Sequence, residues 1–258
     1  MDLGLRGRTA LVTGGSKGIG RAVAERLAEE GVDLHLAARG RDALEAAAAE
    51  IRKAHGVKVT THPVDLAARG VADALGEACG PLDILVNNAG AIPTGGLAEV
   101  GEDAWRNGWD LKVFGTIDLT RRVYAGMKAR GGGAIVNVVG LSTARPSRYM
   151  AGATANAALN AFTRALGGAS LDDGIRVVAV NPGWIHTERM IGMLRAQAAK
   201  KFGDESRWED LTKGQPAPGE PGHVADMVVF LASGRAAHVS GTVINVDGGG
   251  SARGGIPV

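Results

Sequence analysis

The chain alternates short, continuously apolar runs with longer amphipathic segments, and no other feature restricts its fold as strongly. Apolar runs with the length of buried strands occupy these ranges: 8–14, 32–39, 57–65, 82–90, 133–140, 174–183 and 241–249. Helical spacing of apolar residues marks segments between them: 18–31, 41–56, about 103–130, 148–166 and 221–233. Strands without polar alternation are expected where helices cover both faces of a parallel sheet. The sequence therefore predicts one doubly wound α/β domain over 1–258.

One long segment, 185–220, departs from this alternation. It is polar and carries no clear period, and it follows the predicted strand at 174–183. Open α/β sheets bind ligands at the carboxyl ends of their strands. We therefore interpret 185–220 as an insertion that forms a lid over a substrate.

Composition excludes several kinds of partner and site. Lysine and arginine number 29 against 27 acidic residues, so the chain lacks the basic field that nucleic acids select, and a small-molecule substrate is favoured. Cys79 is the only cysteine, which rules out an internal disulfide and predicts no zinc-ligand cluster and no metal site. No secretory leader and no run of about 18 apolar residues stands in the sequence. We expect a cytoplasmic protein without a membrane partner.

The stretch "TGGSKGIG" predicts a phosphate-binding turn. It lies between the first predicted strand and the first helix, where glycines allow a tight turn and a close approach of backbone to a pyrophosphate. Unpaired N–H groups at the helix start favour an anion. The residues expected to bind the cofactor here are Gly14, Ser16, Lys17, Gly18, Ile19 and Gly20.

Five motifs together resemble the short-chain dehydrogenase/reductase family. They are "TGGSKGIG", "VD" at 64–65, "NNAG" at 87–90, "NPGWIHT" at 181–187 and "GTVINVDGG" at 241–249, in the family's order and spacing. The resemblance implies a Rossmann-like fold with a seven-stranded parallel sheet, a nicotinamide cofactor and a homo-oligomer, a tetramer or dimer. It also implies further cofactor contacts: Asp65 and Leu66 at the adenine, Asn88, Ala89 and Gly90 along the cleft, and Pro182, Gly183, Ile185 and Thr187 at the nicotinamide.

The charge at the end of the second strand favours NADP(H) over NAD(H). An NAD site usually places an acid there, which hydrogen-bonds the ribose diol and repels a 2'-phosphate. Here the position is Ala38, followed by Arg39, and Lys17 stands in the glycine loop. Two cations without an acid suit the additional phosphate.

The catalytic positions of the family do not keep their usual residues. By the resemblance, Gly152 stands at the tyrosine, Asn156 at the lysine, Val139 or Gly140 at the serine, and Asp110 at the asparagine. The "YAGMK" stretch, Tyr124 to Lys128, has the tyrosine–lysine spacing but precedes the strand that the working motif follows. We predict that this pair is not catalytic.

Other polar residues are candidate substitutes. Tyr149 lies about one helical turn before Gly152, and Ser142 and Thr143 follow the fifth strand. Each also has an ordinary structural interpretation, as a pocket wall or a turn residue. His186 lies between two predicted nicotinamide contacts, Asn156 keeps an amide that can hydrogen-bond the ribose, and Arg145 and Arg148 suit an acidic substrate.

Three functions stay open at this point. The first is an NADP(H)-dependent oxidoreductase acting on a carbonyl or alcohol with a rearranged acid/base set. The second is a cofactor-binding sensor or partner subunit without redox chemistry, and the third is a lyase or isomerase on the same scaffold. A positioned general acid or base is worth about 10²–10⁴ in rate, so the outcome depends on which group replaces the lost tyrosine.

Overall fold

The computed structural model describes residues 1–141, 149–213 and 217–252. It contains a seven-stranded parallel sheet in the order β3-β2-β1-β4-β5-β6-β7. The strands are β1 (Thr9–Thr13), β2 (Asp33–Ala38), β3 (Val59–Pro63), β4 (Ile84–Asn87), β5 (Gly133–Val138), β6 (Ile175–Pro182) and β7 (Val243–Val246). The strand order reverses direction between β1 and β4, which is the point where doubly wound sheets open a crevice for ligands.

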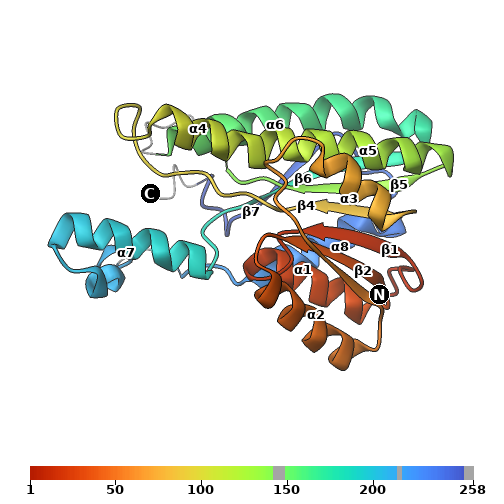
Figure 1. Ribbon diagram of the computed structural model, residues 1–258, viewed down its shortest axis with the longest axis horizontal. Coiled ribbons are helices and arrows are strands. Elements are labelled where there is room, and N and C mark those ends of the chain that lie inside the picture. The colour runs from red at the N-terminus through yellow and green to blue at the C-terminus, as the bar shows by residue number, and fades with distance from the viewer. Residues whose placement is uncertain (142–148, 214–216, 253–258) are drawn as a thin grey trace.

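Helices cover both faces of the sheet (Figure 1). One layer contains α1 (Gly18–Glu29), α2 (Arg41–His55) and α8 (Pro221–Ala232). The opposite layer contains α3 (Val71–Cys79), α4 (Glu102–Trp109), α5 (Gly115–Ala129) and α6 (Met150–Ala169). The predicted Rossmann-like α/β fold with a seven-stranded parallel sheet is thereby confirmed.

Strand β1 illustrates why the apolar runs carry no polar alternation. Ala10 and Val12 point into the core shared with α1, α2 and α8, whereas Leu11 points into the core shared with α3 and α5. All three residues are fully buried. Burying one Val or Leu side chain contributes about 1.5–3 kcal/mol, so both faces of the strand must be apolar.

Two helical regions differ from the sequence prediction. Helix α3 lies within 66–81, a stretch for which no helix was predicted. The predicted continuous helix over about 103–130 is interrupted by a π-helical turn at Asp110–Phe114, between α4 and α5. A π turn inserts an additional residue into the 3.6-residue period, so it changes which side chains face the sheet. This change of phase places Lys112 in the interior.

The segment after β6 is more regular than its sequence indicated. It contains α7 (Glu188–Phe202) and a 3₁₀ helix at Glu205–Leu211, and α7 projects from the body of the molecule (Figure 1). The Thr187 hydroxyl caps α7 by accepting a hydrogen bond from the Met190 amide at 3.2 Å. Ala198 is the only buried residue of α7, so this helix packs weakly on the rest of the chain.

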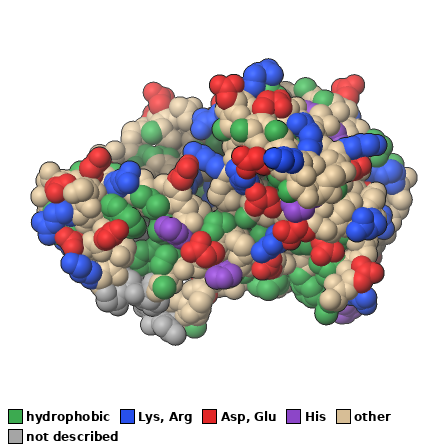
Figure 2. All heavy atoms as spheres, turned by 90° about the horizontal axis from the view of Figure 1, so that it is seen from below, with side chains coloured by type: hydrophobic (Ala, Val, Ile, Leu, Met, Phe, Trp, Pro, Cys, Tyr) green, Lys and Arg blue, Asp and Glu red, His purple; other side chains and the backbone are tan. Residues whose placement is uncertain are grey.

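Basic and acidic side chains are interspersed over the face drawn in Figure 2, and apolar side chains show between them. Among the described residues, no helix is both long and apolar enough to cross a membrane.

Candidate active site

The loop between β1 and α1 has a backbone that strongly favours glycine. Gly14 and Gly18 have positive φ angles of 68° and 57°. A Cβ on Gly20 would lie 2.2 Å from the Gly14 carbonyl oxygen and 2.4 Å from Asn88 Nδ2. Lys17 precedes α1 without a side-chain cap, so the first N–H groups of the helix remain available to an anion. This glycine cradle fits a pyrophosphate.

Residues of the "NNAG" motif join the ends of β1 and β4. Asn88 Nδ2 donates to the Thr13 carbonyl at 2.9 Å, and the Thr13 hydroxyl accepts from the amides of Asn88 and Ala89 at 2.9 and 3.0 Å. Behind them, Asn87 Nδ2 donates to Asn137 Oδ1 at 2.9 Å in the buried interior. These hydrogen bonds fix the ends of β1 and β4 relative to each other at the switch point.

The remaining predicted cofactor residues lie along the same edge of the sheet. Pro182 ends β6, and the Gly183 amide donates to the Val246 carbonyl at 2.9 Å. Thr187 lies against the glycine loop, since a Cβ on Gly18 would be 3.6 Å from Thr187 Cγ2. The structure therefore brings the first and last parts of the predicted cofactor site together.

At the adenine end, two predicted contacts follow β3 and two cations lie on the surface. Asp65 is exposed, its carboxylate accepts from the Ala67 amide at 3.0 Å, and Leu66 is buried. Arg39 is exposed at the end of β2. Lys17 Nζ lies 3.5 Å from Glu188 at the start of α7, and both side chains are exposed, so this ion pair stabilises little.

The π turn places a buried lysine at the carboxyl ends of β4 and β5. Lys112 Nζ donates to the Val139 carbonyl at 2.7 Å and to Asn156 Oδ1 at 2.5 Å. Its stem lies against Gly90, where an added Cβ would be 3.3 Å from Lys112 Cδ. Burial, followed by the positive charge of Arg189, lowers the pKa of Lys112 from 10.5 to about 7.

Asn156 holds both this lysine and the loop after β5. Its Nδ2 donates to the Leu141 carbonyl at 2.8 Å while its Oδ1 accepts from Lys112. Gly140, with a φ of 123°, lies so close that an added Cβ would be 2.9 Å from Asn156 Nδ2. Both polar atoms of Asn156 are therefore engaged within the protein. Its predicted ribose contact stays a prediction.

The ring of Tyr149 occupies the space beside Gly152. A Cβ on Gly152 would lie 2.0 Å from both Cε1 and Cζ of Tyr149, so any other residue at 152 would displace the ring. Burial raises the pKa of Tyr149, and the charge of Arg189 and a hydrogen bond from it lower this pKa in part. Arg189 comes from α7 and also donates to the Gly90 and Ile92 carbonyls.

Several other candidates lie elsewhere or outside the described residues. Ser142, Thr143, Arg145 and Arg148 fall outside the described part of the chain. His186 is exposed, with Nδ1 3.7 Å from a Glu220 carboxylate oxygen. Asp110 is half-buried at the start of the π turn.

The Tyr124–Lys128 pair has partners near the far end of α5. The Tyr124 hydroxyl donates to Asp173 at 2.5 Å, and Lys128 Nζ lies 2.9 Å from the same carboxylate. Burial, a hydrogen bond to Asp173 and nearby negative charge raise the pKa of Tyr124 to about 12. A pair joined to Asp173 in this way braces α5 against the turn after α6.

Sequence reasoning missed Lys112 and Arg189. The only signal for Lys112 was a charged residue among apolar neighbours in "WDLKVFG". A 3.6-residue helical wheel cannot predict its inward direction, because the π turn changes the phase. Arg189 carried no signal, since its partners are backbone carbonyls nearly a hundred positions earlier in the chain.

Comparisons with known proteins agree with this geometry. A family model described as short chain dehydrogenase matches residues 8–198. Galactitol 2-dehydrogenase (L-tagatose-forming) from Cereibacter sphaeroides is 35% identical over 251 residues, 95% of each chain. A 3-oxoacyl-[acyl-carrier-protein] reductase from Vibrio harveyi is 32% identical over 96% of this chain and 98% of its own.

A solved structure is similar over nearly the whole chain. L-Sorbose reductase from Gluconobacter frateurii, in complex with NADPH and L-sorbose, has a TM-score of 0.87 and 35% identity. The match covers 96% of this chain and 98% of that one. The chain therefore belongs to the short-chain dehydrogenase/reductase family, a family of oxidoreductases whose fold binds a nicotinamide cofactor.

Proposed function

We propose that the protein is an NADP(H)-dependent oxidoreductase that interconverts a carbonyl and an alcohol, with Lys112 and Tyr149 as its acid/base and polarising groups. One observation carries the proposal. Lys112 Nζ donates to the Val139 carbonyl, just after β5, and to Asn156 of α6. A group that titrates near neutral pH is suited to general acid/base catalysis.

The hydrogen bonds of Lys112 suit a group that gives and recovers one proton. An ammonium has three N–H donors, and two of them reach Val139 O and Asn156 Oδ1. The third proton can pass to a substrate alkoxide oxygen, and the neutral amine keeps both bonds afterwards. Asn156 is a positioning residue in this scheme because it acts through Lys112.

Tyr149 supplies the hydroxyl that polarises the carbonyl. Its ring lies over Gly152, at the position where the family resemblance expects a tyrosine side chain to begin. Burial keeps the phenol protonated at neutral pH, so it serves as a hydrogen-bond donor to developing negative charge. A donor of this kind contributes about 10²–10³ in rate.

The cofactor we propose is NADP(H), which supplies or accepts a hydride when bound. The glycine cradle would hold its pyrophosphate, and Lys17 and Arg39 would pair with its 2'-phosphate. The similar L-sorbose reductase was solved with NADPH, which supports this choice. The 185–220 segment would serve as a lid over the substrate. Arg189 and the Lys200–Glu99 ion pair, at 2.8 Å, link α7 to residues 90–99, which supports this position.

The test is NADPH consumption by the purified protein with a panel of carbonyl compounds that includes L-sorbose, L-tagatose and a 3-oxoacyl thioester. We expect turnover with at least one, slowed about 10²–10⁴-fold in Lys112→Met. The reduction rate should fall above pH 7 as Lys112 loses its proton. Lys128→Met, at the Asp173 pair, is the matched control and should keep full activity.

Two outcomes would contradict the proposal. Tight NADPH binding without turnover of any panel member would favour a sensor or partner subunit. Product formation without NADPH consumption would favour a lyase or isomerase. The homo-oligomer implied by the resemblance stays a prediction, which light scattering of the purified protein tests.

A further inference from the structure

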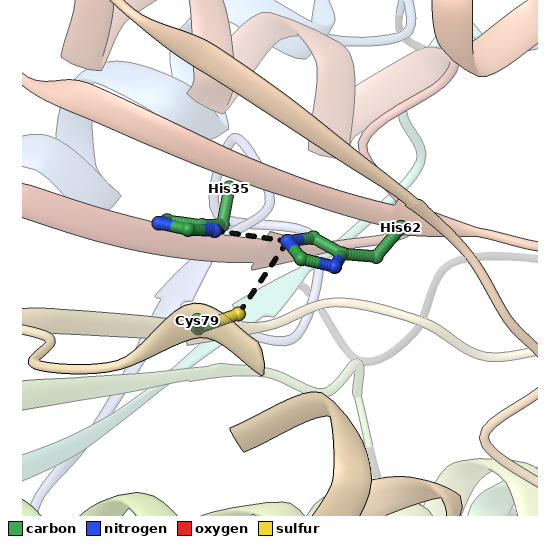
Figure 3. A group of neighbouring side chains, drawn as sticks. All are labelled: His35, His62 and Cys79. Carbon is green, nitrogen blue, oxygen red and sulfur yellow. Dashed lines mark hydrogen bonds between the residues drawn. The ribbon is translucent and has the colours of Figure 1, made fainter. Parts of the chain in front are cut away.

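Three potential metal ligands meet at the β3 edge of the sheet, under the end of α3 (Figure 3). His35 Nδ1 lies 2.9 Å from His62 Nε2, and Cys79 Sγ lies 3.7 Å from the same nitrogen. The three ligand atoms all lie within 4.8 Å of one another. These residues are 44 positions apart at most in sequence, and none belongs to the predicted active site.

The sheet register determines why the two imidazoles meet. In the β2–β3 pair, His35 is opposite Thr60 and Ala37 is opposite His62, so the histidines are diagonal neighbours. Residues i and i+2 of a strand share a face, which places both rings on the α3 side of the sheet. Their rings are stacked with centroids 5.1 Å apart. Cys79, the last residue of α3, covers them from that layer.

These distances are close to those of a tetrahedral site. With metal–nitrogen bonds of about 2.0–2.1 Å and metal–sulfur bonds of about 2.3 Å, neighbouring ligands lie about 3.3 Å (N to N) and 3.6 Å (N to S) apart. The observed distances are 2.9 and 3.7 Å. The third distance, from His35 Nδ1 to Cys79 Sγ, is within 4.8 Å. His35 and His62 are half-buried and Cys79 is buried.

Burial shifts the pKa of each of the three groups. Burial lowers the pKa of His35, and the negative charge of Asp33 opposes this shift in part. Burial also lowers the pKa of His62, and the nearby His35 lowers it further. Burial raises the pKa of Cys79 to about 12, so the thiol keeps its proton until a metal displaces it.

We propose that His35, His62 and Cys79 bind one Zn²⁺ ion, with water as the fourth ligand. Two imidazoles and one thiolate match the ligand preference of zinc, whereas Mg²⁺ and Ca²⁺ require oxygen ligands. The ion ties β2, β3 and α3 together at the edge of the sheet. Binding of this ion would not depend on the proposed redox activity. The sequence predicted no metal site from its single cysteine, and the proposed site departs from that prediction because the fold brings two histidines to Cys79.

The test uses the full chain without a polyhistidine tag, freed of metal by a chelator and titrated with Co²⁺ and then Zn²⁺ under reducing conditions. We expect one Co²⁺ per chain with a tetrahedral visible spectrum and a thiolate-to-cobalt charge-transfer band, both removed by one equivalent of Zn²⁺. Zn²⁺ should also raise the melting temperature, because it binds only the folded chain.

Cys79→Ser and His62→Gln should each weaken Zn²⁺ binding by more than the 10–100-fold that loss of an outer-shell partner typically costs. His238→Gln removes an exposed histidine elsewhere and should change nothing. Absence of the charge-transfer band in the wild type overturns the proposal even if a variant fails to fold. So does Zn²⁺ affinity that neither substitution changes.

Discussion

The proposed cofactor edge and the proposed proton-transfer group lie side by side, yet the chain builds them differently. At the cofactor edge, the glycine loop and the "NNAG" motif stand at the family's positions and act through backbone geometry. In the proton-transfer group, an ammonium comes from the π turn at Lys112 and a phenol comes from Tyr149, over a glycine. Both differ from the positions that the family resemblance assigns.

This difference shows which functions can be moved within one fold. A backbone cradle depends on φ angles and on close approach, so no other segment can provide it. A proton donor needs only an atom at the right place, and long side chains from several elements can reach that place. We therefore expect the proposed proton-transfer group to tolerate a change of residues better than the proposed cofactor edge does.

The largest effect is expected from Gly20→Ala, a substitution in the glycine loop of the cofactor edge. The new methyl group would lie 2.2 Å from the Gly14 carbonyl oxygen, so the loop would have to change its backbone conformation. We expect NADPH affinity to fall about 1000-fold, equivalent to roughly 4 kcal/mol, in a titration of intrinsic fluorescence. Gly168→Ala in α6 has open space around it and is the control, with unchanged affinity. Near-normal binding by Gly20→Ala would show that the cradle is more plastic than its geometry indicates.

A second substitution tests whether Tyr149 uses the space at Gly152. Gly152→Ala places a methyl group 2.0 Å from two ring carbons, so the ring must leave. We expect kcat to fall about 10²–10³-fold in Gly152→Ala and by a similar factor in Tyr149→Phe. The NADPH affinity of both variants should be unchanged. The equivalent addition of a methyl group cannot be made at the neighbouring buried residue Ala151, because alanine already carries one. Full activity in Tyr149→Phe would show that the Tyr149 hydroxyl takes no part in the reaction.

A smaller effect is expected from Arg39→Ala at the other end of the cofactor edge. Loss of one charge-assisted hydrogen bond costs about 1.5–3 kcal/mol, so NADPH affinity should fall roughly 10–100-fold. NADH lacks the 2'-phosphate and serves as the internal control, with little change expected. Equal losses for both cofactors in calorimetric titrations would argue against a phosphate contact at Arg39.

The smallest effect concerns how stability depends on pH. The pKa of Lys112 is about 7 in the folded chain and about 10.5 when it is exposed to water, so between these values the unfolded chain binds more protons. The free energy of unfolding should therefore rise with pH in this window, by on the order of 1 kcal/mol per unit, relative to Lys112→Met. Urea unfolding at pH 7 and pH 9 measures the difference. Parallel pH dependences in the two proteins would mean that Lys112 is charged when folded.

Most of the fold could be predicted because its signals are local. Apolar runs such as the one around Leu11 indicate strands buried on both faces, and the glycines at 14, 18 and 20 indicate the turn between β1 and α1. The helix at Val71–Cys79 was missed because its apolar period is short. The partners of Lys112 could not be predicted, since a π turn leaves no mark in a 3.6-residue period.

The sequence by itself determined the doubly wound sheet and the glycine turn between β1 and α1, and the family resemblance predicts that Gly152 and Asn156 replace the usual tyrosine and lysine. These follow from backbone preferences and from residues close together along the chain. Only the tertiary structure decided that Lys112 reaches Asn156, that Tyr149 covers Gly152, and that His35 and His62 meet Cys79. Each of these meetings depends on strand register or helix phase. Those quantities are set by packing across the whole domain.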